Sequence, residues 1–434
     1  MDEKEQAKTT AVKGTESARK VRAMVKNLYR GAGEARAQGK KVAYFMVASQ
    51  YDEILRAMDV VPVPTENYAG LCAAKRDMDR FLLKAEADGY SQVLCSYTRI
   101  GLGFDSLRKD LGGMPENAPD GGMPLPDMML GSSAVCDPRF KWYQAAGRYM
   151  NVPTYSIDVV APPVFTDLNE VRDHYIRYQR EQFLGLIEFL EQQTGRRMDK
   201  ERLRETIRLG DEAWRLWYET DRLRRATPCA MPSQDHFSVM VPAYYYCGTQ
   251  EAVDFFNDLY AEVKYKVENK IGVIQEEKYR ILYGGGLPPW HTLWIFNYFE
   301  SFGAVFVIEN MYRAYDPVEV PSHVKDPVEY LAWRAFLRLT QRHEKAKANS
   351  GNPVVERLLE MIKDYQIDGV VFHACRSCRA TTIGQVHIKN QLSQYTDIPM
   401  TQLVSDMVDL RDYSEAQWKA QIGAFIEALS TRSA

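Results

Sequence analysis

Two pairs of distant segments resemble each other, and this internal likeness limits the possible folds more than any other feature. Residues 87–101, ADGYSQVLCSYTRIG, share with residues 366–384, QIDGVVFHACRSCRATTIG, an Asp-Gly pair, a short apolar run, a cysteine and a nearby arginine. Residues 147–160, GRYMNVPTYSIDVV, resemble residues 393–408, SQYTDIPMTQLVSDMV. Both contain a turn with an apolar residue before a proline, followed by an expected strand that ends at an acidic residue. This likeness predicts two related halves that face each other across a cleft.

Within each half, apolar runs typical of strands alternate with helical stretches. The expected strands of the first half are KKVAYFMVAS, VVPVP, QVLC, DMMLGSSAVC and VPTYSIDVV, and those of the second are YRILYGGGLPPW, AVFVIE, GVVFHAC and IPMTQLVSDMVD. The alternation predicts an α/β fold of two Rossmann-like halves with parallel sheets, whose strands end at the ligand cleft.

The periodicity predicts four segments. Residues 1–40 form an N-terminal helical arm, 41–164 the first α/β half, 165–270 an intervening helical segment and 271–434 the second α/β half. Inside the helical segment we expect a second helix to open at Asp199, because Asp is a favoured N-cap residue.

Charge and composition give no argument for several partner classes. The formal net charge of -3 and the pI near 6.2 do not indicate binding to nucleic acid or to an anionic membrane surface. The charged N-terminus lacks the apolar core of a signal peptide, and no later run of about 18 apolar residues follows. We therefore expect a cytoplasmic protein without nucleic-acid or membrane partners.

The seven cysteines do not indicate a disulfide framework, because their number is odd and a cytoplasmic setting is reducing. Cys95 and Cys136 each end an expected strand, and Cys375 and Cys378 lie at or just after another. Three loops could thus bring three thiolates to one point, where a 4Fe–4S cluster would keep one iron without a protein thiolate.

Two other interpretations of the cysteines stay open. Free cysteines commonly pack as small buried apolar residues, which is how we interpret Cys72, Cys229 and Cys247. The pair Cys375 and Cys378 also has the C-x2-C spacing of a zinc site, although a second pair is missing from the sequence.

Glycine-rich motifs for nucleotides are not recognisable. The sequence has no G-x4-G-K-[ST] loop, so we do not expect this chain to hydrolyse ATP itself. The segment GGGLPPW at residues 284–290 lacks the G-x-G-x-x-G order of a dinucleotide site. It is either a structural turn or a loop that approaches a bulky ligand, with Trp290 as a flat wall and His291 as a polar group.

The segments DGVVFHACRSCRATTIGQ, EKYRILYGGGLPPWHTLW, FGAVFVIE and PDMMLGSSAVC resemble the family of 2-hydroxyacyl-CoA dehydratases and ATP-dependent (class I) benzoyl-CoA reductases. The likeness is greatest to the B-type or O-type cluster-bearing subunit of benzoyl-CoA reductase, and runs from about residue 40 to the C-terminus. It implies one 4Fe–4S cluster per chain with three cysteine ligands. The family pattern falls on Cys95, Cys136 and Cys378; Cys375 is an extra thiol and the alternative third ligand.

The resemblance also implies a function. A separate ATP-hydrolysing activator, supplied by ferredoxin, would deliver single electrons to this chain and to a second homologous cluster-bearing subunit. A ketyl-type radical of an acyl-CoA would form, and benzoyl-CoA or a close analogue would become a dienoyl-CoA. The alternative is a 2-hydroxyacyl-CoA dehydratase that forms an enoyl-CoA. An alternative of another class is a non-catalytic electron-relay or zinc-stabilised partner subunit.

Candidate proton donors follow from position and chemistry. His373 ends the strand before the cluster loop and is the first candidate, followed by His291, Glu309 and Glu53. A structural histidine is the alternative for His373.

Two arginines lie close after candidate cluster cysteines. Arg99 and Arg379 would offset cluster charge or contact the phosphates of CoA, with a surface salt bridge as the alternative for each.

Overall fold

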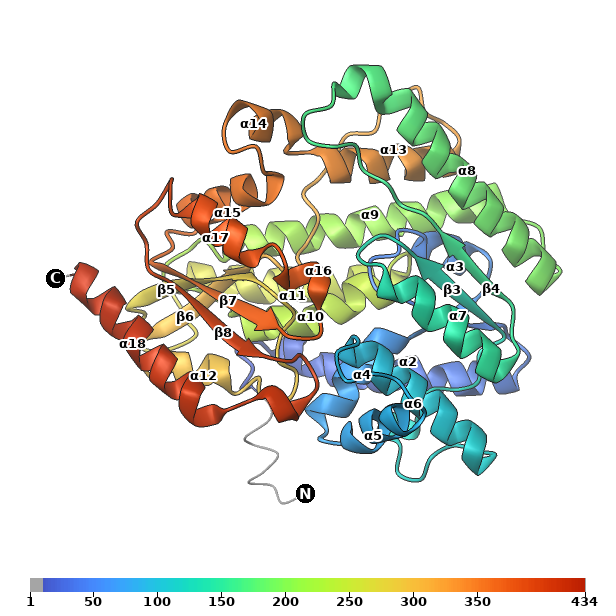
Figure 1. Cartoon of the computed structure of the whole chain (residues 1–434). Helices are drawn as coiled ribbons and strands as arrows, with labels where there is room; N and C mark the ends of the chain where they lie inside the picture. The colour runs from blue at the N-terminus through green and yellow to red at the C-terminus, as the bar shows by residue number, and fades with distance from the viewer. Residues whose placement is uncertain (1–10, 434) are drawn as a thin grey trace.

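A computed structural model describes residues 11–433 of the chain. The predicted fold class is confirmed, since the described residues form two four-stranded parallel sheets surrounded by helices (Figure 1). The first ten residues of the predicted N-terminal arm and the last residue of the second half lie outside the described part. The four predicted segment boundaries stay a prediction.

The two sheets share one strand order. The first sheet has the order β2-β1-β3-β4 and the second has the order β6-β5-β7-β8, with every neighbouring pair parallel. The strands are β1 (Val42–Phe45), β2 (Val61–Pro64), β3 (Met128–Ser132), β4 (Thr154–Ile157), β5 (Tyr279–Gly285), β6 (Ala304–Glu309), β7 (Gly369–Cys375) and β8 (Met400–Ser405). Strand β3 therefore corresponds to β7, and β4 to β8.

Burial explains why these runs form central strands. All residues of β1, β3, β6 and β7 are buried. Parallel sheets are covered on both faces, and such strands are therefore apolar throughout instead of alternating. The helices of the first half are α3 (Asp52–Ala57), α4 (Thr65–Ala74), α5 (Asp79–Ala87), α6 (Ser96–Leu111), the 3-10 turn η1 (Pro119–Gly121) and α7 (Pro138–Met150).

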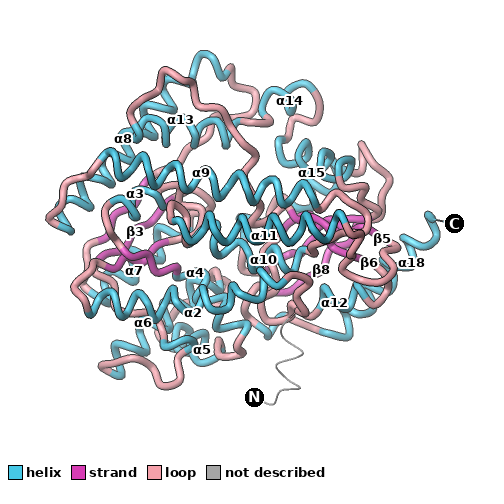
Figure 2. The backbone as a smooth tube through the Cα atoms, turned by 180° about the vertical axis from the view of Figure 1, so that it is seen from behind, coloured by secondary structure: helices cyan, strands magenta, loops and turns pink. Residues whose placement is uncertain are grey.

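Four helices connect the two sheets along the chain, and one further helix precedes the first strand. The four are α8 (Leu168–Thr194), α9 (Lys200–Leu223), α10 (Ser233–Tyr245) and α11 (Gln250–Glu268), and the preceding helix is α2 (Glu16–Ala37). Figure 2, the view from behind, shows α9, α10 and α11 crossing the molecule in front of the sheets. The predicted helix start at Asp199 is confirmed, because its side chain accepts hydrogen bonds from the backbone N–H groups of Glu201 and Arg202 at 2.9 and 3.2 Å.

Shorter helices surround the second sheet. They are α12 (Ile295–Glu300), α13 (Pro327–Thr340), α14 (His343–Ala348), α15 (Pro353–Asp364), α16 (Arg379–Thr382), α17 (Gln385–Leu392), the 3-10 turn η2 (Leu410–Asp412) and α18 (Glu415–Ser433). Among the described residues, we find no helix with both the length and the apolarity needed to cross a membrane.

One predicted strand is wrong. The run QVLC forms a turn between α5 and α6, and Cys95 is the residue before α6 instead of the end of a strand. Val93 and Leu94 are 81% and 40% exposed. Helices α5 and α6 follow each other so closely that these residues turn on the surface, where no strand of either sheet pairs with them.

Candidate functional site

Three cysteines lie in loops that lead into helices. Cys95 directly precedes α6, Cys136 lies two residues before α7, and Cys378 directly precedes α16. All three side chains are half-buried. They come from both halves of the chain, so only the folded structure brings the loops together.

Hydrogen bonds join the immediate neighbours of these cysteines. The backbone N–H of Ser96 donates to Ser377 Oγ at 3.1 Å, which links the residue after Cys95 to the residue before Cys378. Arg379 Nη2 donates to Asp137 Oδ2 at 3.3 Å, which links the residues that follow Cys378 and Cys136. The loop of Cys378 is therefore held between the other two loops.

Asp406, directly after β8, positions two of the loops. Its Oδ1 accepts from Ser96 Oγ at 2.5 Å, and its Oδ2 accepts from Ser377 N at 3.2 Å and from Ser377 Oγ. Asp158, which follows the corresponding strand β4, accepts from Ser133 Oγ in the loop that carries Cys136. The same serine–aspartate contact thus recurs in both halves, beside a cysteine each time.

The thiols influence one another electrostatically. Burial and then the neighbouring Cys378 thiol raise the pKa of Cys95 to about 12. Burial and then Glu66 raise the pKa of Cys136 to about 12, with a contribution from Cys378, and burial raises the pKa of Cys378. Without a nearby cation these groups stay protonated, so a metal that binds them must displace their protons.

Cys375 points into the interior instead. It is fully buried, its Sγ donates to the carbonyl oxygen of Leu287 at 3.4 Å, and it lies 3.2 Å from His373 Nδ1. Burial raises the pKa of its thiol well above the usual value. Its neighbour in sequence, Arg376, bonds to Asp412 and not to either of the other two cysteine loops.

A cavity of about 1090 Å³ ends near these loops. Its wall includes Tyr97, which lies two residues after Cys95, and Tyr312, whose pKa is raised by burial, by Glu66 and by the Cys378 thiol. The indole N–H of Trp290 donates to the hydroxyl of Tyr97. Glu66 also lines this part of the cavity and accepts from Arg139 Nη2 at 2.8 Å.

Residues 51–429 match the family model described as the 2-hydroxyglutaryl-CoA dehydratase D-component. This chain belongs to that family. The resemblance seen in the sequence is thus confirmed for nearly the whole chain.

Individual relatives are similar to this chain at low identity. The (R)-phenyllactyl-CoA dehydratase alpha subunit of Clostridium sporogenes is 27% identical over 413 residues, which cover 91% of each chain. The (R)-2-hydroxyisocaproyl-CoA dehydratase alpha subunit of Clostridioides difficile is 25% identical and covers 93% of this chain and 94% of its own. A benzoyl-CoA reductase subunit of Thauera aromatica is 24% identical, with 91% and 90% covered.

In this family member, both candidate histidines are buried and hydrogen-bonded to neighbouring residues. His373 Nδ1 lies 2.5 Å from the carbonyl oxygen of Leu287, and its Nε2 lies 2.8 Å from Ser405 Oγ. His291 Nε2 lies 2.8 Å from the carbonyl oxygen of Asp406. Burial lowers the pKa of each histidine to about 4, so both imidazoles are neutral near pH 7. Neither residue lines the cavity.

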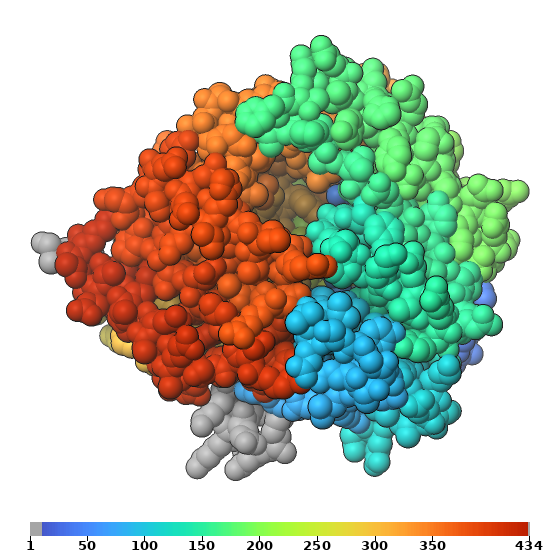
Figure 3. Space-filling model, viewed as in Figure 1, coloured from blue at the N-terminus to red at the C-terminus, as the bar shows by residue number. Residues whose placement is uncertain are grey.

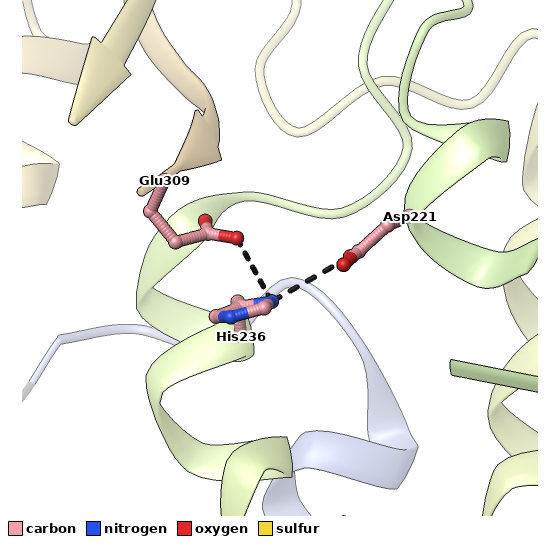
Figure 4. A group of neighbouring side chains, drawn as sticks. All are labelled: Asp221, His236 and Glu309. Carbon is pink, nitrogen blue, oxygen red and sulfur yellow. Dashed lines mark ion pairs between the residues drawn. The ribbon is translucent and has the colours of Figure 1, made fainter. Parts of the chain in front are cut away.

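Glu309 lies in a separate buried cluster with Asp221 and His236 (Figure 4). Its carboxylate is 2.9 Å from His236 Nδ1 and accepts two hydrogen bonds of 2.8 Å from Arg224, which also donates to Asp221. Burial alone would lower the pKa of His236, but Glu309 and Asp221 raise it to about 9. Two anions thus face two cations, which leaves no excess negative charge for a metal ion.

Glu53 and Arg99 also lie in buried ion pairs. Glu53 Oε1 accepts from Arg334 Nη2 at 2.6 Å, which ties α3 to α13. Arg99 donates to Glu86 at 2.9 Å and to Asp409 at 3.0 Å, so α6 is tied to the segment after β8. Neither Glu309 nor Glu53 lines the cavity. The second predicted arginine, Arg379, is exposed and forms an ion pair with Asp137.

Sequence reasoning missed Asp406, Glu66, Tyr97 and Tyr312. Two of them had a recognisable pattern. Asp406 is the acidic residue toward which the repeated segment 393–408 runs, and Glu66 follows the strand VVPVP at the edge where parallel strands end. The two tyrosines had no local pattern that distinguishes them from core aromatics.

Proposed function

We propose that this chain is the iron–sulfur, substrate-binding subunit of an enzyme that reduces an aromatic acyl-CoA by single electrons. Benzoyl-CoA reduction to a dienoyl-CoA is the first candidate reaction. The observation that supports this proposal is that hydrogen bonds join the three cysteine loops beside a cavity of about 1090 Å³ whose wall includes Glu66, Tyr97 and Tyr312.

The three cysteines fit a 4Fe–4S cluster. They are soft sulfur donors from three loops, and their thiol pKa values, high without a metal, fall when iron is near. When bound, such a cluster supplies a low-potential electron and one iron that lacks a protein thiolate. Cys375 remains the alternative third ligand, but its thiol points toward Leu287 and His373.

The surrounding residues position the loops and limit access of water. Asp406 fixes the loops of Cys95 and Cys378 through Ser96 and Ser377. Trp290 and Tyr97 cover the cysteine end of the cavity. Burial raises the pKa of Tyr97 well above its usual value, so its hydroxyl keeps its proton and can donate a hydrogen bond to a bound acyl group.

A 2-hydroxyacyl-CoA dehydratase is the second candidate function. Two of the relatives are subunits of such dehydratases, one of which acts on an aryl substrate, phenyllactyl-CoA. The specific observation in favour is Glu66, a carboxylate in the cavity wall beside the cysteine loops. A dehydration requires a base for the proton next to the leaving hydroxyl, and Glu66 is the residue that we propose for that role.

A second, homologous subunit is the partner that we propose for the face around the cysteines. Exposed apolar side chains flank all three loops: Val93, Leu94, Val135, Ile383 and Val386. On the face shown in Figure 3, the orange-red segment near residue 380 meets the blue and turquoise segments of the first half. Apolar side chains around half-buried thiols indicate a surface that is covered in the assembled enzyme.

Turnover assays test the proposed function. The chain, with its partner subunit, an ATP-hydrolysing activator and a reduced ferredoxin, is supplied anaerobically with benzoyl-CoA or with phenyllactyl-CoA. We expect a dienoyl-CoA from benzoyl-CoA. An enoyl-CoA formed only from phenyllactyl-CoA would replace the first candidate by the second, and turnover of neither would contradict both.

A further inference from the structure

We infer that the cavity beside α2 and α4 binds acyl-CoA in one orientation and selects an uncharged, flat acyl group at its cysteine end. This inference rests on the proposed function and adds the orientation of the ligand, the exclusion of charged acyl groups and the residues responsible. Three observations carry it: the aromatic wall of the inner end, its negative charge, and the cations of the outer end.

The inner end is lined by aromatic rings from separate elements. The rings of Trp290 and Tyr312 have centroids 6.2 Å apart, and those of Phe237 and Trp290 are 6.3 Å apart at 79°. Gly70 faces the indole of Trp290, where a Cβ would lie 3.4 Å from it. Rings at these separations pack against one another, and the faces and edges that they turn toward the cavity can pack against a further aromatic ring.

This aromatic end is fixed to the cysteine loops. The backbone N–H of Trp290 donates to the carbonyl oxygen of Met407 at 3.0 Å, next to the Asp406 side chain that holds Ser96 and Ser377. An acyl group among these rings therefore has its thioester near the cysteines.

The charge at the inner end disfavours a second carboxylate. Glu66 is the charged residue of the cavity wall beside the cysteine loops, and it is held by Val47 N–H at 2.9 Å and by Arg139. Arg139 lies behind Glu66 and does not line the cavity. A dicarboxylic acyl group would thus bring its carboxylate next to the Glu66 carboxylate, which already holds the Arg139 guanidinium.

Cations and carboxylates both line the outer part of the cavity, along α2 and the end of α4. Arg19, Arg22 and Lys75 belong to this wall with Asp77 and Asp120, and Arg22 is exposed with no hydrogen-bond or ion-pair partner that we find within residues 11–433. Lys75 bonds to Asp120, and Arg19 bonds to Glu16. The phosphates of CoA are the anions that this end would contact, and Arg22 is free to pair with them.

Binding measurements on the assembled full-length protein test the inference. Isothermal titration calorimetry under anaerobic conditions compares free CoA, benzoyl-CoA and glutaryl-CoA, which carries a carboxylate at its acyl end. We expect benzoyl-CoA to bind about tenfold more tightly than CoA, because a ring is buried against aromatic walls. We expect glutaryl-CoA to bind no more tightly than CoA.

Variants separate the two ends of the cavity. Trp290→Leu should remove most of the preference for benzoyl-CoA and leave CoA binding unchanged, whereas Glu66→Gln should strengthen glutaryl-CoA binding several-fold. Arg22→Glu should weaken CoA and benzoyl-CoA equally, by about tenfold. Its matched control is Arg36→Glu, about 21 Å further along the same helix, which should change neither affinity. A melting curve for each variant confirms folding.

The outcomes distinguish the inference from the proposed function. If CoA binds but glutaryl-CoA binds as tightly as benzoyl-CoA, or if Arg22→Glu leaves CoA binding unchanged, the inference is wrong. If neither CoA nor any acyl-CoA binds the correctly folded wild type, the proposed function fails with it.

Discussion

At the scale of single residues, Asp406 links the two halves of the site. Its carboxylate accepts from Ser96 Oγ, from Ser377 N and Oγ, and from the backbone N–H groups of Val408 and Asp409. The sequence led us to the cysteines, but not to this residue. The donors of Asp406 are up to 310 residues away in sequence, so no local pattern could reveal them.

Replacing Asp406 by Asn puts an amide donor among these N–H and O–H donors. We expect Asp406→Asn to lower the free energy of unfolding by about 2 to 3 kcal/mol, because buried donors lose a charged acceptor. Iron bound per chain should fall as the cysteine loops separate. Urea unfolding and iron analysis measure both effects, with Asp412→Asn as the control on a more exposed ion pair. Unchanged iron and stability would contradict the assigned role of Asp406.

The buried pair of His236 and Glu309 makes stability depend on pH. Glu309 and Asp221 raise the pKa of His236 from 6.5 to about 9. Protonated His236 therefore stabilises the folded state fully below pH 6.5, and this contribution disappears as the pH rises to about 9.

The variant His236→Gln isolates this titration. We expect the difference in unfolding free energy between wild type and variant to fall between pH 6.5 and 9, by at most about 3 kcal/mol. Urea unfolding at several pH values measures it. A difference that does not change with pH would show that His236 is neutral in the folded protein.

At the scale of elements, strands β1, β3, β6 and β7 were predictable because each is a buried and mainly apolar run. The run QVLC misled for a physical reason, since Val93 and Leu94 are apolar but exposed in a turn. A sequence cannot show whether an apolar run faces a core or a partner protein.

The surroundings of Glu53 could not be predicted from the sequence either. This residue lies near a helix start, but its burial and its pairing with Arg334 arise from packing between distant helices.

The pair of Glu53 and Arg334 predicts a structural role for Glu53. Arg334 also bonds to Asp211, so α3, α9 and α13 meet at this guanidinium. We expect Glu53→Gln to cost about 3 kcal/mol of stability, because Arg334 loses part of its buried counter-charge. Glu344→Gln, on an exposed pair of α14, should cost less than about 0.5 kcal/mol. Slower turnover of benzoyl-CoA with unchanged stability would instead favour the predicted role as a proton donor.

At the scale of the whole molecule, the repeated strand order explains the repeated site. The loops after β3 and β7 carry Cys136 and Cys378, and the acids after β4 and β8 hold Ser133 and Ser377 in those same loops. Segments 147–160 and 393–408 therefore occupy corresponding positions in the two halves, as their similar sequences predicted. The segments around Cys95 and Cys375 do not correspond, because β7 corresponds to β3 and not to the turn before α6.

The apolar face around the cysteines predicts how the subunits assemble. Ile383 is 84% exposed near the loop of Cys378. We expect Ile383→Glu to abolish co-purification with the homologous partner subunit, because a carboxylate would be buried in the interface. Tyr395→Glu, at a position with a 42% exposed ring beyond α17, is the control. A stable complex that contains the Ile383 variant would exclude this face as the interface.

The most direct test of the proposed iron–sulfur centre is an iron, sulfide and zinc analysis of the anaerobically purified protein and its Cys→Ser variants. We predict about four irons per wild-type chain, with loss of iron in the Cys95, Cys136 and Cys378 variants and retention in the Cys375 variant. Zinc without iron in the wild type would contradict the account, and loss of iron in the Cys375 variant alone would contradict the ligand assignment.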